Sequence, residues 1–95
     1  MGRCTKLKIL NLEFNNFEEL PSVVYNLTEL EELDLSYNKK LKRLDDKILQ
    51  LSNLTKLNCS YCNSLVYPLY AVCKHGISAV RKYFTDLQAE KRELD

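Results

Sequence analysis

Leucines and polar residues follow the same order in three places along the chain. Each copy has a leucine, two further residues, a leucine, one residue, a leucine or cysteine, two residues, and then an asparagine or cysteine. The copies begin at Leu7, Leu30 and Leu54, which are spaced by 23 and 24 residues. A pattern that returns at such a period indicates a repeat architecture, in which neighbouring units bury a shared core.

The alternation inside each copy predicts a short strand. Leu10 and Leu12 are two residues apart, so a strand places them on one face and their neighbours on the other. The asparagine that ends a copy, such as Asn38, satisfies backbone groups where the chain turns out of the strand. We therefore expect parallel strands in which equivalent leucines lie side by side, namely Leu10, Leu33 and Leu57.

A second apolar group follows each strand. In the first two copies its members are Phe17, Leu20, Val24 and Leu27, and then Leu41, Leu44, Ile48 and Leu51. In the third copy, Val72 occupies the position that Val24 and Ile48 hold. We expect these residues to close each unit from the side opposite the strand.

This pattern resembles the leucine-rich repeat, in particular a short cytosolic subtype of 23–24 residues that also has a leucine–proline step like Leu20-Pro21. The resemblance covers most of the chain. It implies an α/β fold, a leucine-rich repeat solenoid that forms a short arc with parallel β-strands on its concave face. It also implies repeats at 7–29 and 30–53, a degenerate third repeat at 54–73, and the end of a preceding partial repeat at 1–6.

Residues 74–95 have a different pattern. Apolar residues at Ile77, Val80, Phe84 and Leu87 follow helical spacing and predict an amphipathic helix. The charged tail 88–95 is expected to be solvated or frayed. The segment resembles the C-terminal capping helix of leucine-rich repeat arrays, which implies that the chain represents the C-terminal end of such an array.

The first copy has no capping segment before it, since Cys4 aligns with Leu27 at the end of the next unit. Repeat arrays need polar caps at both ends. We expect a fragment of a longer protein, a truncated product, or a module whose first unit is covered by a partner; a minimal domain with an open edge is the alternative. An open first unit would expose an apolar edge for self-association, formed by Leu7, Leu10 and Leu12.

The residues between the leucines form columns on the outward face of the strands. These columns are Ile9, Glu32 and Lys56; Asn11, Asp34 and Asn58; Glu13, Ser36 and Ser60; and Phe14, Tyr37 and Tyr61. Aromatic side chains suit protein recognition because they offer large contact areas, although local packing at the strand edge is an alternative role. We predict a protein–protein interaction module, an adaptor or the recognition part of a signalling protein; the alternative is a self-associating structural unit.

Composition narrows the choice of partners. The formal net charge of +1 provides no electrostatic basis for binding nucleic acid or an anionic membrane, and no apolar run is long enough to span a bilayer. Four irregularly spaced cysteines indicate reduced thiols and a cytoplasmic location. We therefore expect an unidentified protein partner, with no nucleic acid and no membrane, and a homo-oligomer only through the first unit.

One short motif has the spacing of a metal-binding or redox site. Cys59-Ser60-Tyr61-Cys62 has the C-x-x-C spacing of a zinc half-site or a redox pair. The register argues for a structural role, because Cys59 takes the place of a core leucine and Cys62 that of the asparagine. The single histidine, His75, has no nucleophile or orienting carboxylate assigned to it. We expect no enzyme activity, no cofactor and no metal.

Overall fold

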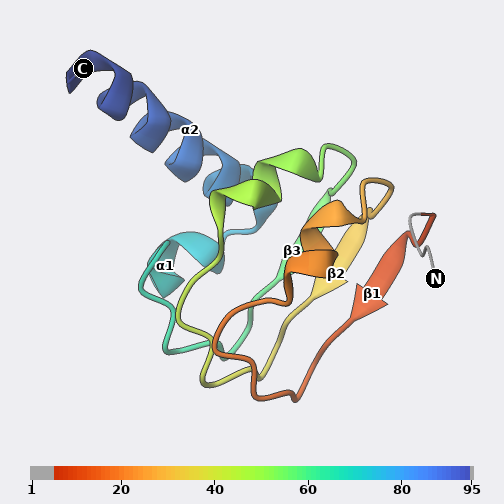
Figure 1. Cartoon of the computed structure of the whole chain (residues 1–95). Coiled ribbons are helices and arrows are strands. Elements are labelled where there is room, and N and C mark those ends of the chain that lie inside the picture. Colours follow the sequence, from red (N-terminus) through yellow and green to blue (C-terminus); the bar gives the residue numbers. More distant parts are fainter. Residues whose placement is uncertain (1–5, 95) are drawn as a thin grey trace.

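Each copy of the leucine pattern forms one short strand, and the apolar group that follows it forms a returning helical segment. The computed structural model describes residues 6–94 (Figure 1). The elements in chain order are β1 (Ile9–Asn11), the 3₁₀ helix η1 (Ser22–Asn26), β2 (Glu32–Asp34), the 3₁₀ helix η2 (Asp46–Gln50), β3 (Lys56–Asn58), α1 (Tyr70–Cys73) and α2 (Ile77–Leu94). The alignment of Cys4, and with it most of segment 1–6, lies outside the described residues.

The three strands form one parallel sheet in the order β1-β2-β3. Leu10 pairs with Leu33, and Leu33 pairs with Leu57, so the predicted side-by-side arrangement of these leucines is confirmed. The extra residue of the second copy does not shift this register. It is accommodated in a turn after the strand, where the Leu41 N–H donates to the Asn38 carbonyl at 3.1 Å.

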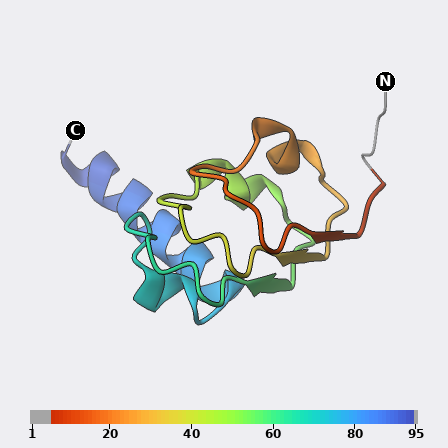
Figure 2. The same cartoon turned by 90° about the horizontal axis from the view of Figure 1, so that it is seen from below.

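The core lies between the sheet and the 3₁₀ helices, which form two layers in the view of Figure 2. The central copy is buried most completely because it has a neighbour on both sides. Leu33 and Leu35 are fully buried, whereas the equivalent Leu10 and Leu12 of the first copy are half-buried. The second apolar group packs as predicted, with all its members buried except the half-buried Phe17.

Backbone hydrogen bonds also join the copies on the side away from the sheet. The Lys42 N–H donates to the Glu18 carbonyl and the Val66 N–H donates to the Lys42 carbonyl, both at 2.9 Å. The Arg43 guanidinium lies 5.3 Å from the centre of the Tyr67 ring, a cation–π distance. The copies are therefore joined by backbone hydrogen bonds both in the sheet and on the opposite side, so they cannot easily hinge against one another.

The two 3₁₀ helices begin differently. Pro21 precedes η1, whereas Asp45 caps η2 by accepting a hydrogen bond from the Lys47 N–H at 3.0 Å. The Asp45 N–H in turn donates to the hydroxyl of Tyr25 at 2.9 Å. Tyr25 is 4% exposed, and burial raises the pKa of its phenol. The repeat pattern contains no signal for a buried tyrosine at this position.

Replacing Asp45 by Ala is expected to lower the free energy of unfolding by about 1 kcal/mol at pH 7, because the cap of η2 is lost. The backbone hydrogen bond from Lys47 lowers the pKa of Asp45. A carboxyl whose pKa is lowered on folding stabilises above its ordinary pKa of about 4 and stops doing so as the pH falls through the folded value. The difference between wild type and variant should therefore shrink in acid.

Urea unfolding of both proteins at pH 7 and pH 3 measures this effect. Asp45→Asn is the matched control, since asparagine caps a helix equally well and does not titrate. A stability gap between wild type and Asp45→Ala that is the same at both pH values would contradict the assignment.

The third copy departs from the prediction at Val72. The structure buries Cys73 completely, whereas Val72 is only half-buried. The reason is that the third copy returns as the α-helical turn α1 instead of a 3₁₀ helix, after a tight turn in which Val66 and Leu69 form a bridge. This changes by one residue which side chain faces the core.

The predicted helix after residue 74 is present as α2. Its apolar side contributes Ile77, Val80 and Phe84 to the core, while Leu87 is half-buried. Arg81 ties it to the junction of the second and third copies, because its Nη2 donates to the carbonyls of Leu51 at 2.8 Å and Leu54 at 2.9 Å. The charged tail was expected to be solvated or frayed; the helix continues through it as far as Leu94, with Ala89 and Glu90 exposed.

Candidate functional site: the outer face of the sheet

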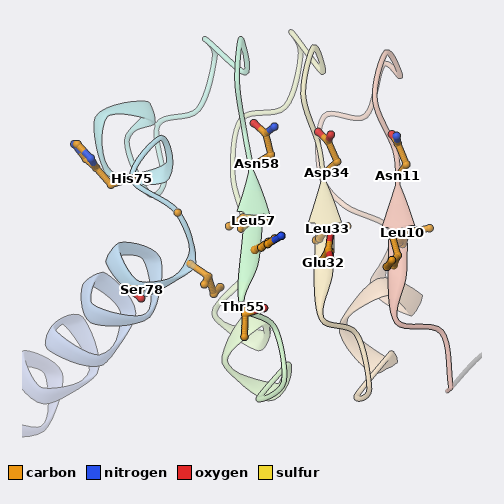
Figure 3. Close-up of a pocket in the computed structure, with 14 residues that line it drawn as sticks. Leu10, Asn11, Glu32, Leu33, Asp34, Thr55, Leu57, Asn58, His75 and Ser78 are labelled. Carbon is orange, nitrogen blue, oxygen red and sulfur yellow. The ribbon is translucent and has the colours of Figure 1, made fainter.

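A hollow of about 500 Å³ lies over the outer face of the sheet, opposite the core (Figure 3). Its floor consists of β1, β2 and residues 55–58. Residues 75–78, which run from the link after α1 into the first turn of α2, form a wall along the β3 side. Gly76 makes this wall possible because its φ of +93° lies in the left-handed region that other residues rarely adopt. We call the outward side chains of the three strands, together with this wall, the sheet face.

The strand register assembles two of the predicted columns. Ile9, Glu32 and Lys56 are register partners, as are the residues of the next column (Asn11, Asp34 and Asn58), which lie in one row in Figure 3. Ile9 is 62% exposed and Lys56 is exposed, whereas Glu32 at the centre is half-buried.

The same small turn follows each strand and holds the second column in place. The Asp34 Oδ1 accepts hydrogen bonds from the N–H and the hydroxyl of Ser36, at 3.0 Å and 2.6 Å. The Asn58 Oδ1 accepts the equivalent pair from Ser60 at 3.0 Å and 2.7 Å. The outward prediction for Ser36 is wrong, because this residue is only 2% exposed. Its hydroxyl is directed to Asp34 in the crowded central copy.

In the first copy the turn is more open. The Asn11 Oδ1 accepts from the N–H of Glu13 at 2.9 Å, and its Nδ2 donates to the Glu13 carboxylate, also at 2.9 Å. Asn11 is exposed and Glu13 is half-buried. Both side chains therefore remain at the rim of the sheet face.

The aromatic column forms a continuous stack. The ring centres of Phe14 and Tyr37 are 4.5 Å apart with an interplanar angle of 8°, and those of Tyr37 and Tyr61 are 4.7 Å apart at 15°. The rings pack on one another, which fits the alternative role of local packing at the strand edge. Phe14 nevertheless remains 71% exposed and Tyr61 53% exposed, so the stack also presents an aromatic surface to solvent.

All three stacked residues have a backbone in the left-handed region, with φ of 57° for Phe14 and 62° for Tyr37 and Tyr61. A bulky residue pays about 1–3 kcal/mol for this conformation. Backbone hydrogen bonds to the next copy support it, from the Phe14 N–H to the Ser36 carbonyl at 3.1 Å and from the Tyr37 N–H to the Ser60 carbonyl at 2.9 Å. No sequence signal marks a positive φ at an aromatic residue.

The asparagine positions fasten the strand ends from the core side, which confirms their predicted role. The Asn38 Nδ2 donates to the carbonyls of Leu35 at 2.7 Å and Leu12 at 2.9 Å. Asn15 also donates to the Leu12 carbonyl, at 2.8 Å, and the Cys62 thiol donates to the Leu35 carbonyl at 3.0 Å. The bonds from Asn38 to Leu12 and from Cys62 to Leu35 bridge adjacent copies and hold the turns below the sheet face at constant spacing.

The cysteines of the C-x-x-C motif lie in the core, as the repeat register predicted. Cys59 is 2% exposed, and Cys62 is fully buried. The hydrogen bond between the thiols of Cys59 and Cys73, together with burial, raises the pKa of Cys59, and burial raises that of Cys62. A raised pKa suppresses the thiolate that metal binding and redox exchange require. Within the part of the chain that the structure describes, no group of three or more His, Cys, Asp or Glu residues could hold a metal ion.

The two remaining predicted features lie at the edges of the sheet. On the β1 side, Leu7 is 36% exposed, while Leu10 and Leu12 are half-buried by their own copy and the next. At the opposite side, His75 is exposed, and its ring is directed away from the strands in Figure 3. His75 therefore contributes backbone rather than its imidazole to the wall of the hollow.

The parallel strands, their constant register and the returning helices define an α/β repeat protein. A family model described as leucine rich repeat matches residues 5–65, and the chain belongs to this family. Domains of this family generally mediate protein–protein interactions and typically have no catalytic activity of their own. Searches of curated proteins and of solved structures give no significant match. Within residues 6–94, the helices are too short or too polar to cross a bilayer.

Proposed function

We propose that the chain is a protein-recognition module, acting as an adaptor or as the recognition part of a signalling protein. In this proposal the three repeats form a short solenoid arc, the sheet face is its concave surface, and α2 is the helix that closes the array. The contacts of Phe84 and Arg81 with the third copy support a closing role for α2. Three free buried thiols suit a reducing, cytoplasmic environment.

One observation supports recognition best. The side chains of the sheet face are fixed in position, yet they keep hydrogen-bonding groups that local turns do not use. Asp34 and Asn58 each use one side-chain oxygen in a local turn, which fixes the direction of the side chain. The second oxygen of Asp34 and the amide nitrogen of Asn58 stay available above the hollow. Binding groups that are already ordered lose less entropy when a partner arrives. Interface aromatics then come from Tyr37, Tyr61 and Phe14 beside the hollow.

Two exposed apolar residues provide a matched test of this surface. Ile9 on the sheet face is 62% exposed, and Val23 on η1 is 61% exposed. Ile9→Arg places a bulky charge on the proposed surface and should reduce binding of the natural protein partner at least tenfold. Val23→Arg adds the same charge on the returning helix and should leave binding unchanged. Quantitative affinity capture from lysate, with both variants and wild type labelled differently, measures the two effects.

The proposal fails if the two variants retain the same set of proteins, or if Val23→Arg is the one that loses them. Thermal unfolding of both variants shows whether a loss reflects binding or folding. Because both positions are similarly exposed, we expect similar small changes in stability.

The second candidate is self-association through the β1 side. It is favoured by the exposure of Leu7 and Ile9 next to the edge of β1. In this case the interface would consist of Leu7, Leu10 and Leu12 together with the outer edge of β1. Sedimentation of the chain across a hundredfold range of concentration decides it, and a constant monomer mass removes this candidate.

A further inference from the structure

The centre of the sheet face contains two carboxylates on one strand. Glu32 and Asp34 are alternate residues of β2, so both side chains emerge on the outer face, about 7 Å apart along the strand. Both are half-buried, because β1 and β3 lie on either side. A charge that is partly removed from water interacts more strongly with an opposite charge than one on an open surface.

Neither carboxylate has an ion-pair partner. Among the side chains that the structure describes, the one salt bridge is between Lys82 and Asp86 on α2, at 3.0 Å. Asp34 receives hydrogen bonds at Oδ1 alone, both from Ser36. Lys56 is the register partner of Glu32, yet its ammonium lies beyond ion-pair distance of either carboxylate. Two carboxylates and one lysine therefore leave the hollow with a negative excess.

The surroundings of the carboxylates are apolar on one side. Ile9 is the register partner of Glu32 on β1, and most of its side chain is open to solvent. A long basic side chain can lay its methylenes on an apolar residue while its charged end reaches a carboxylate. The hollow of about 500 Å³ has room for such a side chain and one neighbour. A guanidinium has several donors in one plane and can reach two acceptors together.

We propose that the protein partner inserts an arginine side chain into this hollow, with the guanidinium between Glu32 and Asp34 and an apolar neighbour over Ile9. The inference rests on the proposed recognition function and specifies the chemistry of the partner segment. The charges of the hollow disfavour an acidic segment, and the exposed Lys56 marks the side on which an acidic residue of the partner would lie.

The test uses a defined probe, the capped dipeptide acetyl-leucyl-arginine amide, against its neutral isostere with citrulline in place of arginine. Titration of ¹⁵N-labelled chain should shift the amide signals of residues 32–34 and 56–58 with the arginine probe. The citrulline probe should bind at least fivefold more weakly. Equal binding of the two probes, or shifts confined to other residues, would overturn the inference.

Charge-removing variants test whether Glu32 and Asp34, and not the overall charge of the chain, bind the arginine probe. Glu32→Gln with Asp34→Asn keeps side-chain size and the acceptor for Ser36, and should weaken the arginine probe about tenfold. Glu18→Gln with Glu29→Gln removes two exposed carboxylates elsewhere and should have no effect. Lys56→Gln should strengthen the probe about threefold, since it removes a competing cation. Misfolding would weaken binding of the probe in every variant, so stronger binding by Lys56→Gln cannot result from misfolding.

Failure of this inference is distinct from failure of the proposed function. If Ile9→Arg abolishes capture of the natural partner while Glu32→Gln with Asp34→Asn leaves it intact, the sheet face recognises a protein without using an arginine. If neither change affects capture, the sheet face is not the binding surface, and both proposals are wrong.

Discussion

Replacing Phe84 by Ala is expected to lower the free energy of unfolding by about 4 kcal/mol. Phe84 is 1% exposed, and its ring centre lies 5.7 Å from that of Tyr67 and 5.3 Å from that of Tyr83. Truncation leaves a cavity where α2 meets the third copy. Since domains of this size are stable by about 5–15 kcal/mol in total, the loss is a large fraction of the whole.

Urea unfolding followed by far-ultraviolet circular dichroism measures this loss. Phe14→Ala is the control, because it removes the same side chain where 71% of it is exposed. Its expected cost is about 1 kcal/mol or less, from one lost stacking partner. If Phe84→Ala costs no more than Phe14→Ala, then α2 is not part of the core and does not close the array.

The second large effect is expected for Asn38→Ala, at about 3 kcal/mol. The change removes the amide donor that bridges the carbonyls of Leu35 and Leu12, and each lost hydrogen bond costs about 1–1.5 kcal/mol. The Leu12 carbonyl keeps the Asn15 amide as a donor. The Cys62 thiol remains on the Leu35 carbonyl but is a weaker donor.

Asn15→Ala is the control for Asn38→Ala, since Asn15 makes the equivalent bonds within its own copy and is exposed. We expect it to cost about 1 kcal/mol, because water can replace the lost donor. Equal destabilisation by the two variants, measured by urea unfolding, would show that the asparagine row contributes through the turn alone and not through burial.

Both stability predictions bear on recognition. The sheet face is assembled from side chains of three strands and one wall, so its geometry depends on the spacing between copies and on the position of α2. Asn38 maintains the spacing between copies, and Phe84 maintains the position of α2. Variants at these two positions should therefore be compared with the surface variants only under conditions where they remain folded.

The sequence by itself determined the repeating part of this protein. The register of Leu10, Leu33 and Leu57 followed from the repeated leucine pattern, because equivalent positions of stacked parallel strands align even though the spacings are 23 and 24 residues. The buried position of Cys62 followed from its alignment with Asn38. Two outward columns, Ile9, Glu32 and Lys56 and then Asn11, Asp34 and Asn58, followed from the alternation within each strand, as did the inward position of Cys59. A period-two strand leaves no other choice of face once its leucines are buried.

The tertiary structure decided what depends on contacts between different copies. The burial of Ser36, the exchange of Val72 for Cys73 in the core, and the position of Tyr25 against Asp45 each involve a neighbour that no local pattern specifies. The left-handed backbone at Phe14 and Tyr37 is supported by hydrogen bonds that the adjacent copy accepts. The hollow itself exists because residues 75–78 return beside β3, and this path is set by how α2 packs on the third copy, which periodicity does not encode.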